Sequence, residues 1–314
     1  MKIAFLADPL SGFKIYKDST FAMMREAARR GHAVYHFEQR DMLLEEGVVS
    51  ARVARIHLTG DQDAWYRLDP AEDVNLGEFD AIIERKDPPF DMEYVYGTYL
   101  LELAERQGAR VINSPRAIRD HNEKLAIGKF SEHTSPTMVT SDAARLRAFH
   151  VKHGDVIFKP LDGMGGAGIF RVKSDGLNLG AIIETLTDNG RNTIMAQKFI
   201  PAIEKGDKRV LVIGGKPVPF VLARIPQGGE VRGNLAAGGL GVAQPISPRE
   251  REIAEAVGPV LAERGLLLVG LDVIGDFLTE VNVTSPTCFQ EIHDQTGFDV
   301  AAMFIDAVEQ KVSD

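Results

Sequence analysis

The alternation of apolar and polar positions over the first third of the chain predicts a parallel sheet with crossover helices. Apolar runs of strand length occupy residues 2–7, 32–37, 80–86 and 110–114, and helical patterns occupy 20–30 and 92–107. Strands that alternate with helices in this way are typical of βαβ units. Asp18 or Ser19 is expected to begin the first helix, and Gly31 to end it. The next segment, 113–120, indicates a linker.

The rest of the chain predicts a second α/β region. We expect helices at 122–132 and 248–264, and strands at 155–159, 193–199, 209–213, 217–224 and in a hairpin that includes residues 278–282. The glycine-rich stretches between these elements are too unevenly spaced for a repeat array. The predicted fold class is therefore α/β, with a boundary between residues 121 and 122.

The predicted hairpin brings together two carboxylates and an amide. Side chains two apart on a strand share a face, so Glu280 and Asn282 point the same way. A two-residue turn at Gly275 would put Asp272 and Glu280 on opposite faces, whereas a three-residue turn would set them opposite each other on one face. In the second case the three oxygen ligands suit Mg²⁺. A hairpin whose polar residues face water is the alternative.

A glycine loop follows the strand that ends at Lys159. Four glycines between residues 163 and 168 let backbone amides approach a ligand without a Cβ in the way. A lysine that ends a strand beside such a loop suits a polyphosphate, although the residue order is not that of a P-loop. An ordinary hairpin turn is the alternative here. Lys124, taken alone, indicates only a surface lysine on a helix.

Composition limits the classes of partner. The formal net charge of -9 over 314 residues argues against nucleic acid or an anionic membrane, because either would call for a basic surface. Cys288 is the one cysteine, which excludes an intrachain disulfide and fits a reducing cytoplasm. No run of about 18 apolar residues occurs that would predict a membrane helix. We therefore expect a soluble cytoplasmic protein.

Six segments, taken in order, resemble the ATP-grasp superfamily and, within it, the bacterial glutathione synthetases. They are residues 85–91 (RKDPPFD), 119–125 (RDHNEKL), 159–172 (KPLDGMGGAGIFRV), 206–212 (GDKRVLV), 222–239 (LARIPQGGEVRGNLAAGG) and 270–287 (GLDVIGDFLTEVNVTSPT). The resemblance implies an N-terminal parallel-sheet domain, 1–121, followed by a two-lobed ATP-grasp domain, 122–314. Its first lobe would be 122–200, with the glycine loop, and its second 201–314, with a lid loop at 225–240 and the metal hairpin.

The activity implied by the resemblance is ATP-dependent ligation of γ-glutamylcysteine to glycine through an acyl phosphate, which gives glutathione, ADP and phosphate. Another ATP-grasp carboxylate–amine ligase, of the D-alanine or protein-glutamate type, is the first alternative; segments 85–91 and 226–239 discriminate against it. A non-catalytic nucleotide-binding module and a purely structural α/β protein are the others. A non-catalytic module would be expected to lack a metal ligand or a phosphate lysine. A purely structural protein leaves the basic residues at strand ends unexplained. A homo-oligomer is expected by family analogy alone.

The resemblance also assigns residues to ATP and metal. The phosphates would be held by Lys124 and Lys159 under a loop that includes Gly163, Gly165 and Gly166. The backbone of the segment Gln197, Lys198, Phe199 and Ile200 would meet adenine, and Asp207 would meet the ribose. The metal ligands would be Asp272, Glu280 and Asn282, with Mg²⁺ as the expected ion and Mn²⁺ as the alternative.

The remaining assignments concern the reacting groups. Arg209 and Arg224 would lie near the transferred phosphate and the reacting carboxylate, and Arg224 with Asn234 or Asn282 would stabilise the tetrahedral oxyanion. The substrate-binding candidates are Arg85, Arg232, Asn234, Ser285 and Glu291. Arg232 and Asn234 belong to the predicted lid, which would close over the intermediate. A surface ion pair is the alternative for each arginine.

Overall fold

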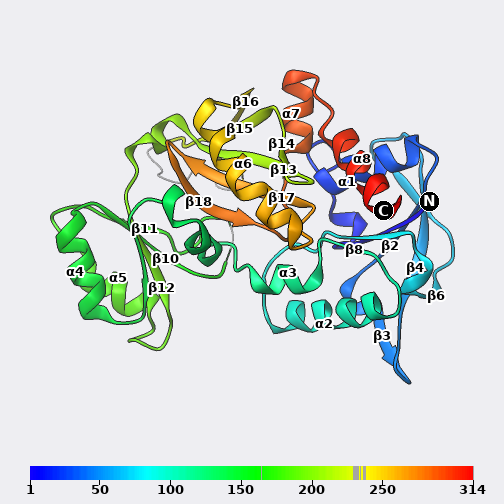
Figure 1. Ribbon diagram of the computed structural model, residues 1–314, viewed down its shortest axis with the longest axis horizontal. Helices are drawn as coiled ribbons and strands as arrows, with labels where there is room; N and C mark the ends of the chain where they lie inside the picture. The colour runs from blue at the N-terminus through cyan, green and yellow to red at the C-terminus, as the bar shows by residue number, and fades with distance from the viewer. Residues whose placement is uncertain (164, 229–232, 234, 236–237, 314) are drawn as a thin grey trace.

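The computed structural model describes residues 1–163, 165–228, 233, 235 and 238–313 (Figure 1). It contains three sheets, which follow one another along the chain. The N-terminal sheet lies at one end of the molecule, a small four-stranded sheet lies at the other, and a six-stranded sheet lies between them (Figure 1). This arrangement confirms the expected α/β class.

Four strands of the N-terminal sheet are parallel, in the order β2-β1-β7-β8, as predicted. Their bounds are Lys2–Leu6 (β1), Ala33–Phe37 (β2), Ala81–Glu84 (β7) and Val111–Ile112 (β8). Helices α1 (Ser19–Arg29) and α2 (Met92–Arg106) connect them. Asp18, rather than Ser19, is the N-cap of α1, because its carboxylate accepts from Phe21 N at 2.7 Å.

The N-terminal sheet also contains antiparallel strands that the sequence pattern did not predict. The four strands from residue 42 to 75 are antiparallel: β3 (Met42–Glu45), β4 (Val48–Leu58), β5 (Tyr66–Leu68) and β6 (Glu72–Asn75). Glu46 and Gly47 join β3 to β4 with φ of 49° and 84°. Such a tight turn returns the chain antiparallel, because a parallel pair needs a much longer crossover.

The small sheet has the order β11-β10-β12-β9 and is antiparallel. Its strands are β9 (Thr137–Thr140), β10 (Val156–Pro160), β11 (Phe170–Val172) and β12 (Ile194–Lys198). Helices α4 (Ala143–His153) and α5 (Leu179–Leu186) cover it, and Leu146, Phe158 and Ile183 are fully buried between sheet and helices. The glycine loop joins β10 to β11.

The third sheet has the order β16-β15-β13-β17-β18, with β14 beside β13. Its strands are β13 (Asp207–Ile213), β14 (Lys216–Pro217), β15 (Phe220–Ile225), β16 (Leu240–Pro245), β17 (Leu268–Ile274) and β18 (Phe277–Asn282). Helix α6 (Pro248–Glu263) packs on one face, where Val257, Leu271 and Val281 share a buried cluster. The strand expected at 217–224 is split between β14 and β15 because Pro217 and Pro219 cannot donate to a ladder.

Two further predictions are wrong in detail. The expected linker at 113–120 contains a helix, α3 (Pro115–Asp120), and Pro115 occupies a first-turn position that suits proline. The helix expected at 122–132 is the 3₁₀ helix η4 (Leu125–His133), interrupted at Phe130. Gly128 within it disfavours a regular α-helix. The other 3₁₀ helices are η1 (Leu10–Gly12), η2 (Gln39–Asp41), η3 (Leu76–Glu78) and η5 (Pro201–Lys205).

The C-terminal helices return to the N-terminal sheet. Helices α7 (Phe289–Thr296) and α8 (Val300–Ser313) lie beside α1 (Figure 1). Arg30 donates to Asp306 at 2.6 Å and to Glu309 at 2.9 Å, and Phe5 and Phe304 belong to one buried cluster. The boundary at 121/122 stays a prediction. Among the helices of the described residues, none is long and apolar enough to cross a membrane.

Candidate functional site

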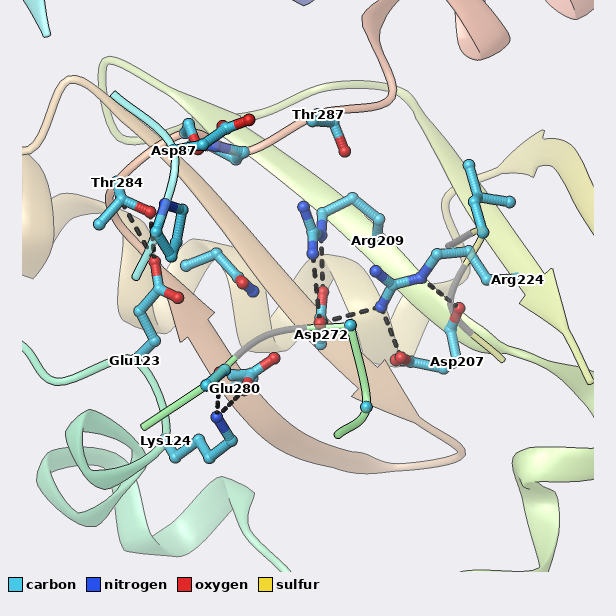
Figure 2. Close-up of a pocket in the computed structure, with 18 of the residues that line it drawn as sticks. Asp87, Glu123, Lys124, Asp207, Arg209, Arg224, Asp272, Glu280, Thr284 and Thr287 are labelled. Carbon is cyan, nitrogen blue, oxygen red and sulfur yellow. Dashed lines mark hydrogen bonds and ion pairs between the residues drawn. The ribbon is translucent and has the colours of Figure 1, made fainter. Parts of the chain in front are cut away.

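Two adjoining cavities lie where the glycine loop faces the six-stranded sheet. One has a volume of about 330 Å³ and the other about 140 Å³. Both are lined by Lys124, Ile169, Asp207, Asp272 and Glu280, so they form one continuous site. Figure 2 shows the larger of the two. Charged side chains of β13, β15, β17 and β18 project into it, so it is called the polar cavity below.

The hairpin β17–β18 places Asp272 directly opposite Glu280. Of the two turns considered, it has the two-residue one, since Ile274 pairs with Phe277; with regular pairing this turn would put the two carboxylates on opposite faces. The register shifts between Val273 and Asp272, which makes Thr279 the extra residue of a β-bulge. Thr279 Oγ1 donates to Asp272 O at 3.0 Å. The bulge therefore restores the pairing that a regular two-residue hairpin would have prevented.

Two arginines hold the Asp272 carboxylate. Arg209 donates through Nε to Oδ1 at 2.6 Å and through Nη2 to Oδ2 at 3.3 Å, and Arg224 Nη2 lies 2.9 Å from Oδ2 (Figure 2). Burial alone would raise the pKa of Asp272, but the two guanidinium groups outweigh it and hold that pKa below its ordinary value. The carboxylate is therefore ionised at neutral pH.

Asp207 closes the same network. Arg224 Nη2 lies 2.5 Å from Asp207 Oδ2, while the buried Asp207 Oδ1 has no partner among the described residues. Burial raises the pKa of Asp207 to about 6, against the opposing effect of Arg224. Asp207 lines both cavities, so its carboxylate is suited to accept a hydrogen bond from a ligand hydroxyl.

Glu280 faces two lysines across the site. Lys124 Nζ lies 3.5 Å from Glu280 Oε1, and it also donates to the main-chain oxygens of Asp162 and Gly163 at 3.1 and 2.9 Å. Burial, and then the charge of Asp272, raise the pKa of Glu280 to about 7. Burial lowers the pKa of Lys159, which Glu280 opposes. An additional cation at this position would therefore stabilise the ionised form of Glu280.

The donors at the hairpin fit a hard divalent cation. Asn282 donates its Nδ2 to Gly270 O at 3.0 Å, which leaves its amide oxygen as an acceptor at the cavity wall. Within the described part of the chain, no group of three His, Cys, Asp or Glu residues could hold a metal ion. The hairpin offers two carboxylates, Asp272 and Glu280, and the amide oxygen of Asn282. Two carboxylates and an amide oxygen are ligands that Mg²⁺ prefers.

The smaller cavity is mainly apolar. Side chains of Ile157, Ile169, Ile203 and Ile274 contribute to it, and the expected adenine segment lines it throughout: Gln197, Lys198, Phe199 and Ile200. Lys124 lines both this cavity and the polar one, and Lys159 lines this cavity. An apolar slot beside lysines and carboxylates suits a flat aromatic base joined to phosphates.

The glycine loop borders the polar cavity. Gly163, Gly165 and Gly166 line it, with φ of 77°, 68° and 77°, a region that side chains with a Cβ disfavour. The loop thus brings main chain to the cavity beside Lys124.

Of the expected substrate-binding residues, only some line the cavities of the described structure. Ser285 lines the polar cavity, and its hydroxyl donates to Asp87. Arg85 and Glu291 line neither cavity. Arg85 is buried and Glu291 is half-buried, and each has one buried polar atom without a partner among the described residues, Arg85 Nη1 and Glu291 Oε2. Arg232 and Asn234 lie outside the described residues, as do residues 229–231, 236 and 237 of the predicted lid.

Several lining residues carry contacts that the sequence did not reveal. Glu123 Oε1 accepts from Val283 N at 3.0 Å and from Thr284 N and Oγ1 at 3.2 and 2.9 Å, so it fixes the chain after β18 beside Lys124 (Figure 2). Its position directly before Lys124 was the available signal. Asp87, in the segment 85–91, also lines the cavity.

Comparison with protein-family models gives two matches. Residues 1–119 match the prokaryotic glutathione synthetase N-terminal domain, and residues 123–297 match the prokaryotic glutathione synthetase ATP-grasp domain. Among relatives, the glutathione synthetase of Ralstonia nicotianae is 67% identical over 310 residues, 99% of this chain and 96% of that protein. The glutathione synthetase of Nitrosomonas europaea is 57% identical over 316 residues, 100% of this chain and 99% of that protein.

Solved structures support the fold. The D-cycloserine synthetase DcsG superposes with a TM-score of 0.68 at 15% identity, and the ATP-grasp ligase PsnB in complex with its minimal precursor superposes with 0.65 at 18% identity. Each comparison covers 99% of both chains. Together with the family match, they confirm an ATP-grasp fold preceded by an N-terminal domain.

Proposed function

The chain belongs to the prokaryotic glutathione synthetase family, and we propose that the two cavities are its active site. There the enzyme would join γ-glutamylcysteine to glycine through an acyl phosphate. It is an ATP-dependent ligase, and the product is glutathione. The observation that carries the proposal is the continuity of an apolar slot at residues 197–200 with a polar cavity in which Asp272 faces Glu280. That arrangement supports binding a nucleotide with its phosphates directed at a charged reaction centre.

The proposed division of the chain follows the two family matches. Residues 1–121 form the N-terminal domain and 122–314 the ATP-grasp domain, in lobes 122–200 and 201–314. The nucleotide lies between the lobes. Its base occupies the slot along Gln197, Lys198, Phe199 and Ile200, its ribose lies near the unpaired oxygen of Asp207, and Lys124 and Lys159 hold the phosphates under the glycine loop.

The first chemical step activates a carboxylate. An oxygen of the cysteinyl carboxylate of γ-glutamylcysteine attacks the γ-phosphorus of ATP, the bond to the bridging oxygen breaks, and ADP leaves. Phosphoryl transfer needs positioning and charge neutralisation more than covalent help. Arg209 and Arg224 face the same cavity as Lys124, so their cationic groups surround the transferred phosphate.

The second step forms the amide. The glycine amine attacks the acyl carbon and loses a proton, and phosphate leaves. Arg224, together with Asn282 or Asn234, stabilises the oxyanion of the tetrahedral intermediate. Ser285, Arg85 and Glu291 are the proposed substrate contacts, with Glu291 pairing the amino group of the γ-glutamyl moiety and Arg232 supplied by the lid.

Asp272, Glu280 and Asn282 would hold the divalent ion, which we propose to be Mg²⁺, with Mn²⁺ as the alternative. When bound, the ion would neutralise charge on the phosphate oxygens. For Asp272 this requires a change of partner, because Arg209 and Arg224 occupy both of its oxygens. A phosphate would offer the arginines a replacement.

The proposal extends to the setting of the enzyme. Cys288 is buried and unpaired, which fits a reducing cytoplasm. The substrates are ATP, γ-glutamylcysteine and glycine, with no role for nucleic acid or membrane. Self-association is proposed by family analogy only.

Phosphate release tests the function directly. With ATP, Mg²⁺ and γ-glutamylcysteine, glycine should accelerate phosphate release, and glutathione should appear in equal amount. D-alanine in place of both substrates, and a peptide ending in glutamate, test the other ATP-grasp ligase types. Release that depends on either of these, and not on γ-glutamylcysteine with glycine, would contradict the proposal.

A further inference from the structure

We infer that Arg171 and Asp155 are positioning residues that hold Phe199 as a wall of the nucleotide slot. The inference rests on the proposed function, in which residues 197–200 meet the base. Arg171 lies on β11, directly after the glycine loop, and Asp155 lies directly before β10. Neither belongs to the residues that line the two cavities.

Three contacts join these residues into a closed unit. Arg171 donates through Nε to Asp155 Oδ1 at 2.9 Å and through Nη2 to Oδ2 at 2.6 Å. The guanidinium carbon of Arg171 lies 3.5 Å from the centre of the Phe199 ring. Phe199 N in turn donates to the main-chain oxygen of Asp155 at 2.9 Å. The ring of Phe199 is therefore held by the ion pair, and its main chain by the main chain of Asp155.

The strand register places this unit on the face that carries the slot. Arg171 pairs with Ile157 across β10 and β11, and residues paired in an antiparallel ladder share a face. Asp155 is two residues before Ile157, so it lies on that face too. Ile157 lines the slot, as does Phe199. The ion pair consequently lies on the same side of the sheet as the slot, although neither of its residues lines the slot.

The unit also connects the two ends of the nucleotide site. Ile169, two residues before Arg171, ends the segment that returns from the glycine loop and lines both cavities. A bidentate arginine–carboxylate pair restricts rotation, and stacking on an aromatic ring fixes the guanidinium plane. Holding Arg171 thus fixes Phe199 at the base end and Ile169 toward the phosphate end.

Nucleotide affinity is the property that should respond. Arg171→Met should raise the Kd for ADP and the KM for ATP about three- to tenfold, the range for losing one cation–π contact and one bidentate pair. Turnover at saturating ATP and the KM values for γ-glutamylcysteine and glycine should stay within about twofold of the parent, because the polar cavity is untouched. Asp155→Asn should give the same pattern.

Arg191 provides a matched control on the same lobe. It donates to Asp188 in the same two-pronged manner, at 2.8 and 2.6 Å, but it is exposed and lines neither cavity. Arg191→Met should leave both nucleotide constants unchanged. If Arg171→Met and Arg191→Met both leave ADP affinity at the parent value, the inference is overturned and the Arg171 pair is merely structural.

A double-mutant cycle tests whether Arg171 acts through Phe199. In a Phe199→Leu background, Arg171→Met should have little further effect on ADP affinity; fully additive effects would overturn the inference. Arg171→Lys, which retains charge and fold, should lose most of the same affinity because lysine lacks the planar fork. Calorimetric titration with ADP needs no turnover. A parent that binds ADP without forming glutathione would therefore contradict the proposed function alone, and a parent that binds no ADP would contradict both.

Discussion

Asp272 lies directly opposite Glu280 across the β17–β18 hairpin, and the pKa values of the two carboxylates are shifted in opposite directions. The pKa of Asp272 is lowered by Arg209 and Arg224 despite burial, whereas burial and the charge of Asp272 raise that of Glu280 to about 7. A divalent cation would therefore change the pKa of Glu280 more than that of Asp272, because binding the ion stabilises the charged form of Glu280.

Glu280→Gln should therefore reduce turnover on the order of 10²- to 10³-fold, as expected when one preorganised stabilising group is lost. The fold should be retained, because glutamine has nearly the same shape. Turnover is measured at saturating ATP and Mg²⁺. Glu263→Gln, at an exposed position on α6, is the control and should behave as the parent. Near-normal turnover of Glu280→Gln would exclude Glu280 as a metal ligand.

Lys159→Ala should weaken ADP binding markedly, because it removes a buried cation from the lining of the smaller cavity. The same change at exposed Lys311 should alter stability by no more than about 0.5 kcal/mol and leave ADP binding unchanged. Since burial lowers the pKa of Lys159, ADP affinity of the parent should also decline at alkaline pH earlier than for an ordinary lysine. Equal calorimetric affinities for both variants and the parent would remove Lys159 from the site.

The hairpin shows how far sequence alone could reach. The identities and spacing of Asp272, Glu280 and Asn282 were sufficient to predict an oxygen-rich site, but the bulge was not predicted. Leu278 and Val281, three residues apart, are both fully buried. Strict alternation cannot place both in the core, so the packing demand of those two side chains requires an extra residue at 279.

Contacts between distant segments were beyond sequence reasoning for a similar reason. The sequence shows Arg171 after a glycine loop and Asp155 sixteen residues earlier, but their pairing follows only from the register of β10 with β11. Among the antiparallel strands from 42 to 75, β3, β5 and β6 were also missed, because they are short and largely exposed. Short exposed strands carry little hydrophobic signal.

Glu123 should matter for both stability and catalysis. Glu123→Ala leaves the main-chain N–H groups of Val283 and Thr284 without their carboxylate acceptor, which should lower the free energy of unfolding by about 1 to 3 kcal/mol. Turnover should fall about 10- to 100-fold, because Lys124 loses its fixed distance from Glu280. Glu123→Gln keeps an acceptor oxygen, so its free energy of unfolding and its turnover should both fall less than those of Glu123→Ala. Urea unfolding and steady-state rates check this; unchanged turnover in a destabilised Glu123→Ala variant would limit Glu123 to stability.

Glu84 should make stability depend on pH. It is buried at the end of β7, where it accepts from Tyr94 Oη at 2.9 Å and Lys86 N at 3.1 Å. Burial raises its pKa from 4.5 to about 8. The folded protein therefore keeps the proton over a range in which the unfolded chain has lost it. The contribution of the protonated Glu84 to the free energy of unfolding is therefore fully present below pH 4.5. It falls by up to about 5 kcal/mol as the pH rises to 8.

Glu84→Gln should remove that pH dependence, because the amide stays neutral. Relative to the parent, the variant should gain stability steadily from pH 5 to pH 8 and then keep a constant advantage. Urea unfolding at pH 5, 7 and 9 measures the difference, in which contributions from Asp207 and Glu280 cancel because both proteins retain them. Glu132→Gln, at a side chain that is 68% exposed, is the control and should show no such trend. Parallel profiles for Glu84→Gln and the parent would mean that Glu84 is already ionised in the folded protein at neutral pH.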